Sequence, residues 1–232
     1  MKQPHAKLSV VATPIGNLED ITLRALRTLK EADVIACEDT RVSKKLLMHF
    51  NIHTPLISFH AHSGKRGMEK ILSLLKEGKT LALVSDAGTP GVSDPGLELI
   101  SFVREHLGDR VKIETIPGPS ALVAAISISG LRVASFVFYG FLPPQKGREK
   151  IFTKIGAEKR ASIFYESPYR IIKALNSLGV HLTPTRRVGV FRELTKIYEE
   201  SIVGGVQHVC QILLDHPEKQ RGEFVVIVEE EK

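Results

Sequence analysis

Residues 81–96 read LALVSDAGTPGVSDPG, an apolar run followed by a segment rich in glycine, proline and aspartate. The apolar run at 81–85 has the length of a buried strand, and the residues after it are those that form tight turns. A helical pattern follows at 97–105, so the segment predicts a strand, a loop and a helix in that order. This unit, repeated along the chain, decides the fold.

Strand-like and helix-like segments alternate throughout the first half of the chain. Short apolar runs predict strands, and apolar residues at helical spacing predict helices between them. Asp20 or Thr22 is the expected N-cap of the first helix. The alternation predicts βαβ units and a mostly parallel sheet. The expected strands are 8–12, 34–37, 56–59, 81–85 and 111–116, and the expected helices are 23–32, 41–50, 68–76 and 97–105.

A Pro-Gly-Pro-Ser segment at 117–120 predicts a domain boundary near residue 118. The second half has more hairpin-like spacing between its segments, which predicts a mixed, partly antiparallel sheet. We therefore expect two α/β domains, 1–118 and 119–232. The strands expected in the second are 136–139, 161–165, 187–191 and 224–228, and the helices are 120–128, 150–155, 169–178 and 206–215.

Composition places the chain among soluble globular proteins. It has 232 residues, of which 43% are hydrophobic and 25% charged, and no apolar run reaches the roughly 18–20 residues that span a bilayer. Cys37 and Cys210 lie in apolar segments, which favours buried reduced thiols over a disulfide. We therefore expect a cytoplasmic protein.

Several common sites are excluded by residue order. No G-x-G-x-x-G follows the first strand, which argues against a dinucleotide fold. Residues 78–80 (GKT) stand between a helix and a strand, so Gly78 is interpreted as a helix C-cap and not as part of a phosphate-binding loop. His60 and His62 lack a Cys or carboxylate partner at ligand spacing, so we predict no metal site.

Positive charge is concentrated in the second half. Residues 141–196 contain 12 Lys and Arg against 4 Asp and Glu, a net charge of +8. The whole chain has a net charge of +6, so the remaining residues sum to −2. Such a segment fits a polyanionic partner, and a solvated basic surface is the alternative.

Three Gly/Pro-rich turns each follow a predicted strand, at 13–17, 85–96 and 117–120. The carboxyl ends of parallel strands are where α/β proteins bind ligands, so the turns are expected to converge on one site. The turns contain no Lys or Arg, and Asp86 and Asp94 would repel phosphate. A ligand with cationic or hydroxyl groups suits them better, and plain tight connections are the alternative.

Seven segments, in this order, resemble those of the ribosomal RNA small subunit methyltransferase I family, a branch of the tetrapyrrole (corrin/porphyrin) methylases. The resemblance extends from Leu8 to Val228. The segments are VATPIGNLEDIT (11–22), EDTR (38–41), SDAGTPGVSDPG (85–96), PGPSA (117–121), FYESP (164–168), RELTK (192–196) and GEFV (222–225). Phe191 departs from the pattern, because a small residue usually precedes RELTK.

The resemblance implies a two-domain class III methyltransferase fold that binds S-adenosyl-L-methionine in the cleft between the domains, usually as a homodimer. It implies as substrate the 2′-hydroxyl of a cytidine in the decoding region of 16S ribosomal RNA, within the small ribosomal subunit. It also assigns residues to the cofactor, namely Pro14, Asp86, Gly88, Ser120, Ala121, Tyr165, Arg192 and Glu193.

A ribose hydroxyl is a weak acid, so a base or a nearby cation should assist the transfer. Glu38 or Asp39 is the candidate base, and Arg41 or Lys196 the candidate electrostatic partner. Glu38 and Asp39 have an alternative role as caps of the helix that starts near Arg41. A methylase of tetrapyrroles or other small molecules, and a non-catalytic RNA-binding module, are the rival functions.

Overall fold

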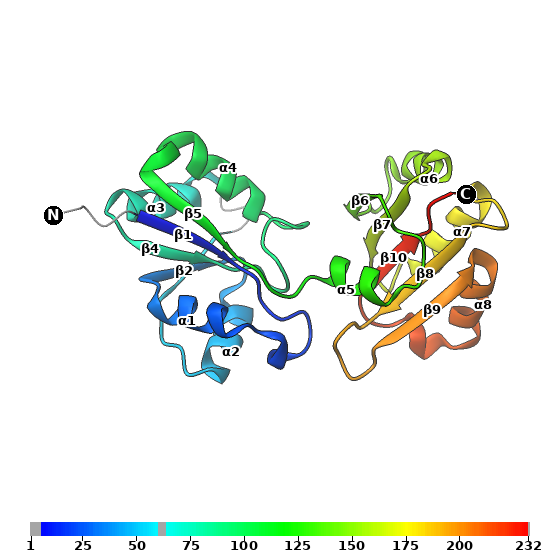
Figure 1. The fold of residues 1–232 in the computed structure, drawn as a ribbon, viewed down its shortest axis with the longest axis horizontal. Coiled ribbons are helices and arrows are strands. Elements are labelled where there is room, and N and C mark those ends of the chain that lie inside the picture. Colours follow the sequence, from blue (N-terminus) through cyan, green and yellow to red (C-terminus); the bar gives the residue numbers. More distant parts are fainter. Residues whose placement is uncertain (1–5, 60–63, 232) are drawn as a thin grey trace. The chain divides into compact units, whose positions relative to one another are not determined.

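The computed structural model describes residues 6–59 and 64–231, and the chain divides into two compact units, Met1–Ser120 and Ala121–Lys232 (Figure 1). Each unit contains one five-stranded sheet with helices packed on it. The expectation of one sheet in each half of the chain is therefore confirmed.

The first unit is built around a parallel sheet with strand order β3-β2-β4-β1-β5. All its strand pairs run parallel, with Leu8 of β1 opposite both Leu81 of β4 and Ile113 of β5. The strands are β1 (Ala6–Val11), β2 (Val34–Cys37), β3 (Leu56–Ser58), β4 (Thr80–Leu83) and β5 (Val111–Ile116). The helices are α1 (Leu23–Glu31), α2 (Thr40–His49), α3 (Gly64–Lys76) and α4 (Gly96–Leu107), with short 3-10 turns at Leu18–Asp20 and Gly108–Arg110.

Helices cover both faces of this sheet. Figure 1 shows α1 and α2 on one face and α3 and α4 on the other. Leu29 of α1 and Leu47 of α2 share one core with Ile35, whereas Leu75 of α3 and Leu99 of α4 share a second core with Leu81. The interior strands β2 and β4 are almost entirely apolar because helices bury both of their faces, whereas the edge strand β5 carries Lys112 and Glu114.

The second unit contains a mixed sheet with strand order β6-β7-β10-β8-β9. Only β6 and β7 pair in parallel, and the other neighbours are antiparallel. The strands are β6 (Phe136–Phe141), β7 (Ala161–Glu166), β8 (Arg187–Arg192), β9 (Glu200–Gly205) and β10 (Phe224–Val228). The helices are α5 (Ala121–Ile128), α6 (Arg148–Ala157), α7 (Ile171–His181) and α8 (Val206–Asp215), with a 3-10 turn at Pro217–Gln220.

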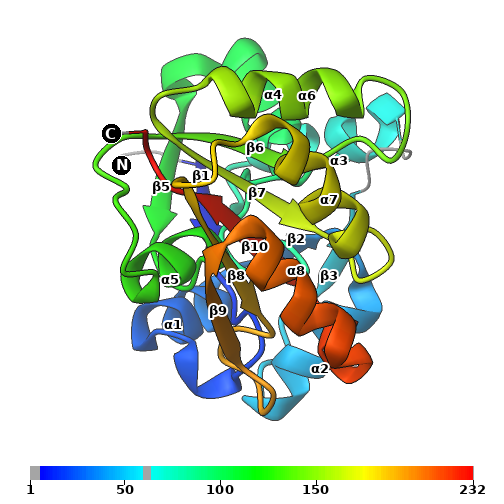
Figure 2. The same ribbon diagram turned by 90° about the vertical axis from the view of Figure 1, so that its right-hand side faces the viewer.

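The core of this unit lies between the sheet and the helices α6, α7 and α8. Phe152 of α6 and Leu175 of α7 are buried there with Phe164 and Val226 of the strands. Figure 2 shows α7 and α8 lying in front of the strands.

The structure adds one strand that the sequence did not predict. Residues 200–205 (ESIVGG) form β9, which pairs with β8 from Arg187 to Arg192. It begins with a Glu and ends with two glycines, so it lacks the continuous apolar run by which the other strands are recognised. Thr22 is the N-cap of α1 and accepts from the N–H of Ala25 at 3.0 Å, which decides between the two expected caps.

Both thiols are buried and free, as expected, and burial raises the pKa of each. No helix among the described residues has the length and apolar character needed to span a membrane. His60 and His62 lie outside the described residues.

Candidate functional site

The three Gly/Pro-rich turns of the first unit meet at the carboxyl ends of β1, β4 and β5. Thr13 and Gly88 exchange two backbone hydrogen bonds, with N···O distances of 2.9 and 3.1 Å. The hydroxyl of Thr89 donates to the carbonyl of Pro119 at 3.0 Å and joins the third turn. The predicted convergence of the turns is therefore confirmed.

Gly88 is the tightest point of this junction. Its φ of +79° is in the region that favours glycine, and a Cβ there would lie 3.3 Å from Cγ2 of Ile15. A side chain at this position would be both strained and crowded. Glycine therefore lets the 85–91 loop lie against the 13–17 turn.

A cavity of about 320 Å³ opens beside the junction, between two of the turns and α2. We call it the loop cavity. Its volume is within the range of small-molecule sites, and its walls combine apolar side chains with a few polar groups, as such sites do. The residues that line it are Thr13, Pro14, Ile15, Gly16, Leu18, Val42, Ser43, Lys45, Leu46, Ser85, Asp86 and Ala87.

Asp86 connects this cavity to the start of α2. Its Oδ1 accepts a hydrogen bond from the backbone N–H of Asp39 at 3.0 Å. Oδ2 of Asp86 forms no hydrogen bond with the described residues and remains available to a ligand. Asp94, by contrast, accepts from the N–H groups of Gly91 and Gly96 at 2.7–2.9 Å. The Asp94 carboxylate therefore holds its own loop together, and its suitability for a ligand stays a prediction.

Asp39 has the role of helix cap that we considered as its alternative. Its side chain is the N-cap of α2 and accepts from the N–H of Arg41 at 2.8 Å. It also forms an ion pair with the Arg41 guanidinium, with a shortest N···O distance of 2.6 Å. The side-chain bond with Arg41 lowers the pKa of Asp39 to about 2. Such a carboxylate is a weak proton acceptor at neutral pH, which favours capping and orientation over general-base catalysis.

Glu38 precedes this cap and follows β2 at the same edge of the sheet, where it is half-buried. Its position next to Asp39 keeps it as the candidate base. Ser120 closes the third turn and Ala121 begins α5, so these two candidates lie at the boundary between the units.

In the second unit, Tyr165 lies near the end of β7 and is half-buried. Its ring packs against Phe138 and Phe141, with centroids 5.1 and 5.2 Å away. Burial raises the pKa of its hydroxyl, so the group is neutral at physiological pH.

Arg192 at the end of β8 serves a structural role. Its guanidinium is buried and donates to the carbonyls of Arg221, Tyr198 and Glu218. It also lies 3.6 Å from a carboxylate oxygen of Glu200. These contacts fasten the β8–β9 loop to the segment before β10, so Arg192 shapes the site more than it offers a free charge.

Glu193 and Lys196 form an ion pair within the RELTK loop. Lys196 Nζ lies 2.9 Å from Glu193 Oε1 and 2.7 Å from Glu223 Oε2. Burial alone would lower the pKa of Lys196, but the two carboxylates raise it overall. Lys196 is therefore a cation at neutral pH, as an electrostatic partner must be.

The same loop carries unusual backbone geometry. Glu193 and Thr195 have φ of 51° and 66°, which non-glycine residues adopt rarely. Gly222 is required beside them, since a Cβ there would overlap the Glu193 side chain at 2.5 Å. Strained backbone of this kind clusters at functional sites.

Phe191, the departure from the family pattern, is fully buried, and its ring lies over Gly189, where a Cβ would come within 2.6 Å of it. The lack of a side chain at Gly189, two residues earlier on the same strand, therefore makes room for the Phe191 ring.

The sequence did not single out the α2 residues that line the loop cavity. Val42, Ser43, Lys45 and Leu46 contribute one wall of it. The sequence feature that could have identified them is a pair of apolar residues, Val42 and Leu46, at helical spacing directly after the EDTR motif.

Comparison with known proteins places these features in a family. The Tetrapyrrole (Corrin/Porphyrin) Methylases match residues 7–210. "Ribosomal RNA small subunit methyltransferase I" of Thermotoga maritima is 42% identical over 224 residues, which are 96% of this chain and 97% of that protein. The protein of the same name from Halalkalibacterium halodurans is 47% identical over 96% of this chain and 75% of its own. The chain belongs to the ribosomal RNA small subunit methyltransferase I family.

The fold agrees with this assignment. The uroporphyrin-III C-methyltransferase of Thermus thermophilus, solved in complex with S-adenyl homocysteine, superimposes with a TM-score of 0.66 at 18% identity and covers 97% of both chains. The expected tetrapyrrole methylase-like fold, with a parallel first sheet and a mixed second sheet, is confirmed.

Proposed function

We propose that this chain is a cytoplasmic enzyme that transfers a methyl group from S-adenosylmethionine to the RNA of the small ribosomal subunit. The observation that carries the proposal is the 42–47% identity, over 96% of the chain, to two proteins named for that reaction. Within that RNA we propose the 2′-hydroxyl of a cytidine in the decoding region of 16S ribosomal RNA as the acceptor.

The residues of the loop cavity suit the methyl donor. Asp86 offers a carboxylate oxygen to a ribose hydroxyl or a cationic group, and Ile15 and Leu46 offer apolar surface to an adenine ring. Gly88 lets the backbone approach closely, and Pro14 forms part of the wall. A bound sulfonium supplies the electrophilic methyl group. Tyr165, Arg192 and Glu193 of the second unit, with Ser120 and Ala121, remain proposed contributors to donor binding.

Methyl transfer requires the acceptor oxygen to be held close to the methyl carbon and in line with the bond that breaks. We assign Glu38 as the group that accepts the hydroxyl proton, because the Asp39 carboxylate is held by Arg41 and by the helix it caps. Arg41 and Lys196 are cationic side chains that can lower the pKa of a nearby hydroxyl or orient a phosphate. Asp39 orients Arg41.

A small-molecule methylase is the rival function, because the superimposed Thermus thermophilus enzyme is named for uroporphyrin-III. That likeness, at 18% identity, speaks for the fold alone.

The decisive test is incubation with methyl-labelled S-adenosylmethionine and small ribosomal subunits that lack the modification. We expect label in the 16S RNA, at a nucleotide whose 3′ bond resists alkaline cleavage because its 2′-oxygen is methylated. Label on a base would contradict the 2′-hydroxyl assignment, and absence of label from the RNA would contradict the function itself.

We also propose that the enzyme works as a homodimer. The second unit exposes several large apolar side chains, with Val123 of α5 61% and Phe141 of β6 57% exposed. Light scattering during gel filtration should give about twice the chain mass of 25.7 kDa, and a mass of one chain at micromolar concentration would refute the dimer.

A further inference from the structure

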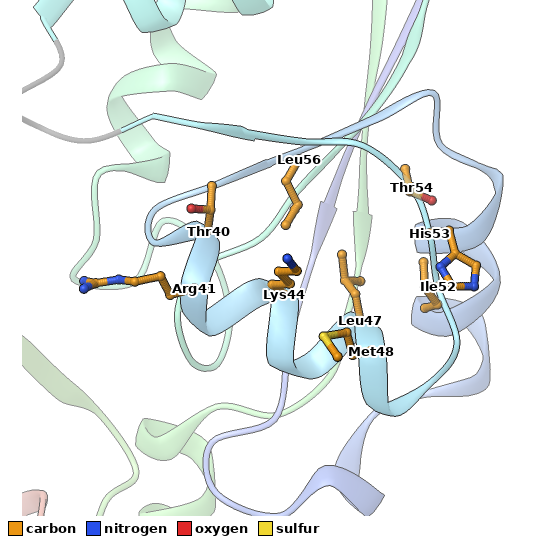
Figure 3. Close-up of a pocket in the computed structure, with 9 residues that line it drawn as sticks. All are labelled: Thr40, Arg41, Lys44, Leu47, Met48, Ile52, His53, Thr54 and Leu56. Atoms are coloured by element: carbon orange, nitrogen blue, oxygen red, sulfur yellow. The ribbon is translucent and has the colours of Figure 1, made fainter.

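A second and larger hollow of the first unit lies on the opposite side of α2 from the loop cavity. We call it the α2 groove. It has a volume of about 630 Å³ and is lined by Thr40, Arg41, Lys44, Leu47, Met48, Ile52, His53, Thr54 and Leu56. Figure 3 shows it between α2 and the segment 52–56, with Arg41 at one end and His53 at the other. We propose that this groove binds an RNA nucleotide that flanks the methylated one.

The proposal rests on the proposed function and deepens it, because it assigns a binding site for the RNA chain.

The charge of the groove fits a phosphodiester. Arg41 and Lys44 are cationic, and none of the nine lining residues is a carboxylate. Lys44 is exposed and forms no ion pair with any carboxylate of the described residues. Arg41 uses Nε and Nη2 for Asp39, and its Nη1 makes no hydrogen bond within the described part of the chain. Both side chains can therefore donate to phosphate oxygens.

The floor of the groove fits a base and a ribose. Leu47 and Ile52 are 4% and 5% exposed and form an apolar floor, whereas Met48 is 65% exposed at the rim. His53 adds an imidazole ring, a type of side chain on which unpaired bases stack. A cationic edge beside an apolar floor is the combination that single-stranded nucleic acid requires.

The groove is coupled to the loop cavity through three side chains. Asp86 lines the loop cavity and accepts from the N–H of Asp39, and the carboxylate of Asp39 in turn holds Arg41 in the α2 groove. Lys44 follows Arg41 by about one helical turn on the same side of α2. A nucleotide in the groove would thus be fixed relative to the cavity by a rigid helix and its cap.

The basic second half supplies fewer free cations than its sequence suggests. Arg148, Arg186 and Arg192 are buried, and Arg160, Arg170, Arg187 and Lys196 are ion-paired. Most of that charge is therefore buried or paired with a carboxylate, which gives the unpaired Lys44 of the α2 groove more weight in RNA binding.

The test compares Lys44→Ala and Lys44→Glu with the matched control Lys70→Glu. Lys70 is also an exposed lysine, in the middle of α3, and it lines neither hollow. Fluorescence anisotropy would give the Kd of a labelled single-stranded RNA with the 16S decoding-region sequence at several salt concentrations. Calorimetry with S-adenosylmethionine and a melting curve would show that donor binding and folding are intact.

We expect Lys44→Ala to weaken RNA binding about fivefold at 0.1 M salt and to reduce the salt slope by about 0.7, the value for one phosphate contact on a single strand. Lys44→Glu should weaken it further, and Lys70→Glu should leave it within about twofold of the parent. Donor affinity should be unchanged in all three variants.

Equal Kd values and salt slopes for the parent, Lys44 variants and Lys70→Glu would overturn the groove as an RNA site while leaving the methylation reaction standing. Absence of label in RNA with the parent enzyme would instead overturn the proposed function. Cytidine monophosphate serves as a separate probe: Lys44-dependent binding of this nucleotide without Lys44-dependent binding of RNA would also overturn the proposal.

Discussion

Oδ1 of Asp86 lies 3.0 Å from the backbone nitrogen of Asp39, and this hydrogen bond ties the glycine-rich loop after β4 to the N-terminus of α2. The two residues are 47 positions apart in the sequence, and each belongs to a segment that resembles the family pattern. Asp86 thus positions Asp39 through its backbone N–H, and the Asp39 carboxylate in turn caps α2 and holds Arg41. Helix α2, between the loop cavity and the α2 groove, is the shared wall of both.

Asp86→Asn should weaken the binding of S-adenosylmethionine about tenfold. The amide keeps an acceptor for the Asp39 N–H but loses the negative charge, and hydrogen bonds to charged groups are stronger than neutral ones by about 1 kcal/mol or more. Calorimetry would measure the Kd. The control is Glu98→Gln, an exposed carboxylate on α4 that lines neither hollow. Equal donor affinity in both variants would remove Asp86 from the donor site.

Gly88→Ala should destabilise the protein and weaken donor binding together. The positive φ alone costs about 1 kcal/mol for alanine, and contact of the new methyl group with Ile15 displaces the wall of the loop cavity. Gly147→Ala is the matched control, because Gly147 has a φ of +88° and open space around it. Urea unfolding and calorimetry separate the two effects. Both variants should lose stability, and only Gly88→Ala should lose donor affinity.

Asp39→Asn tests whether Asp39 caps or catalyses. Asparagine is as good an N-cap as aspartate, so the melting temperature should hold, whereas Asp39→Ala should lower it by a few degrees. A general base would lose about 10²–10⁴-fold in single-turnover rate on becoming an amide. We expect a loss of less than tenfold, because Arg41 is released but no proton acceptor is removed. A larger loss at saturating donor would restore Asp39 as the base.

The pH dependence of Asp39 follows from the same contacts. Its pKa of about 2 in the folded state lies below the usual value of about 3.9. Its contribution to stability is therefore complete above about pH 4 and is lost only as the pH falls through about 2. The melting temperatures of the parent and of Asp39→Asn should run parallel from pH 5 to pH 9.

Much of the fold could be predicted because buried strands and amphipathic helices leave local patterns. The strands at 34–37, 111–116 and 224–228 and the helix at 206–215 have the predicted bounds. Residues 200–205 carry no such pattern, and they form a strand because the edge of β8 offers unpaired backbone groups. Pairing of that kind depends on the partner strand, which the local sequence does not contain.

The site was predictable where glycine and proline restrict the backbone, and less so where side chains share partners. The turns at 13–17, 85–96 and 117–120 were predicted to lie together, and hydrogen bonds join them in the structure. The sequence does not show that the Arg192 guanidinium donates its hydrogen bonds to three backbone carbonyls. Nor does it show that the Asp94 carboxylate accepts from the N–H groups of its own loop. Hydrogen-bond partners far apart in sequence decide which polar groups remain available, and composition does not reveal them.

Lys196→Met should slow methylation at least about tenfold with little effect on donor affinity, since it removes a cation that we assign to the acceptor side. The pKa of Lys196 is raised in the folded state. Its contribution to stability is therefore fully present below the usual lysine pKa of about 10.4, and it is lost only as the pH rises through the folded-state pKa. No alkaline fall in rate below pH 10 should therefore come from this group. Lys173→Met, an exposed lysine of α7 without an ion pair among the described residues, is the control. Equal rates for both variants would show that Lys196 only supports the loop.

The buried pair of Arg148 and Glu166 fixes α6 to the end of β7 in the second unit. Both side chains are almost fully buried, and Glu166 also accepts from Arg170 Nε at 2.9 Å and from the N–H of Ser167 at 2.8 Å. Removal of one partner leaves a buried charge without compensation, so Glu166→Gln should destabilise the protein by about 3–5 kcal/mol.

The double variant Arg148→Met/Glu166→Leu should be less destabilised than Glu166→Gln, because apolar side chains of similar volume remove both charges at once. Urea unfolding of Arg148→Met, Glu166→Leu and the double variant gives the coupling free energy directly. The exposed pair of Glu158 and Arg160 provides the comparison, and Glu158→Gln should leave the unfolding midpoint nearly unchanged. If the double variant is as unstable as the sum of the singles, then Arg148 and Glu166 contribute separately, through Phe152 under the guanidinium and through the Ser167 N–H, and not as a pair.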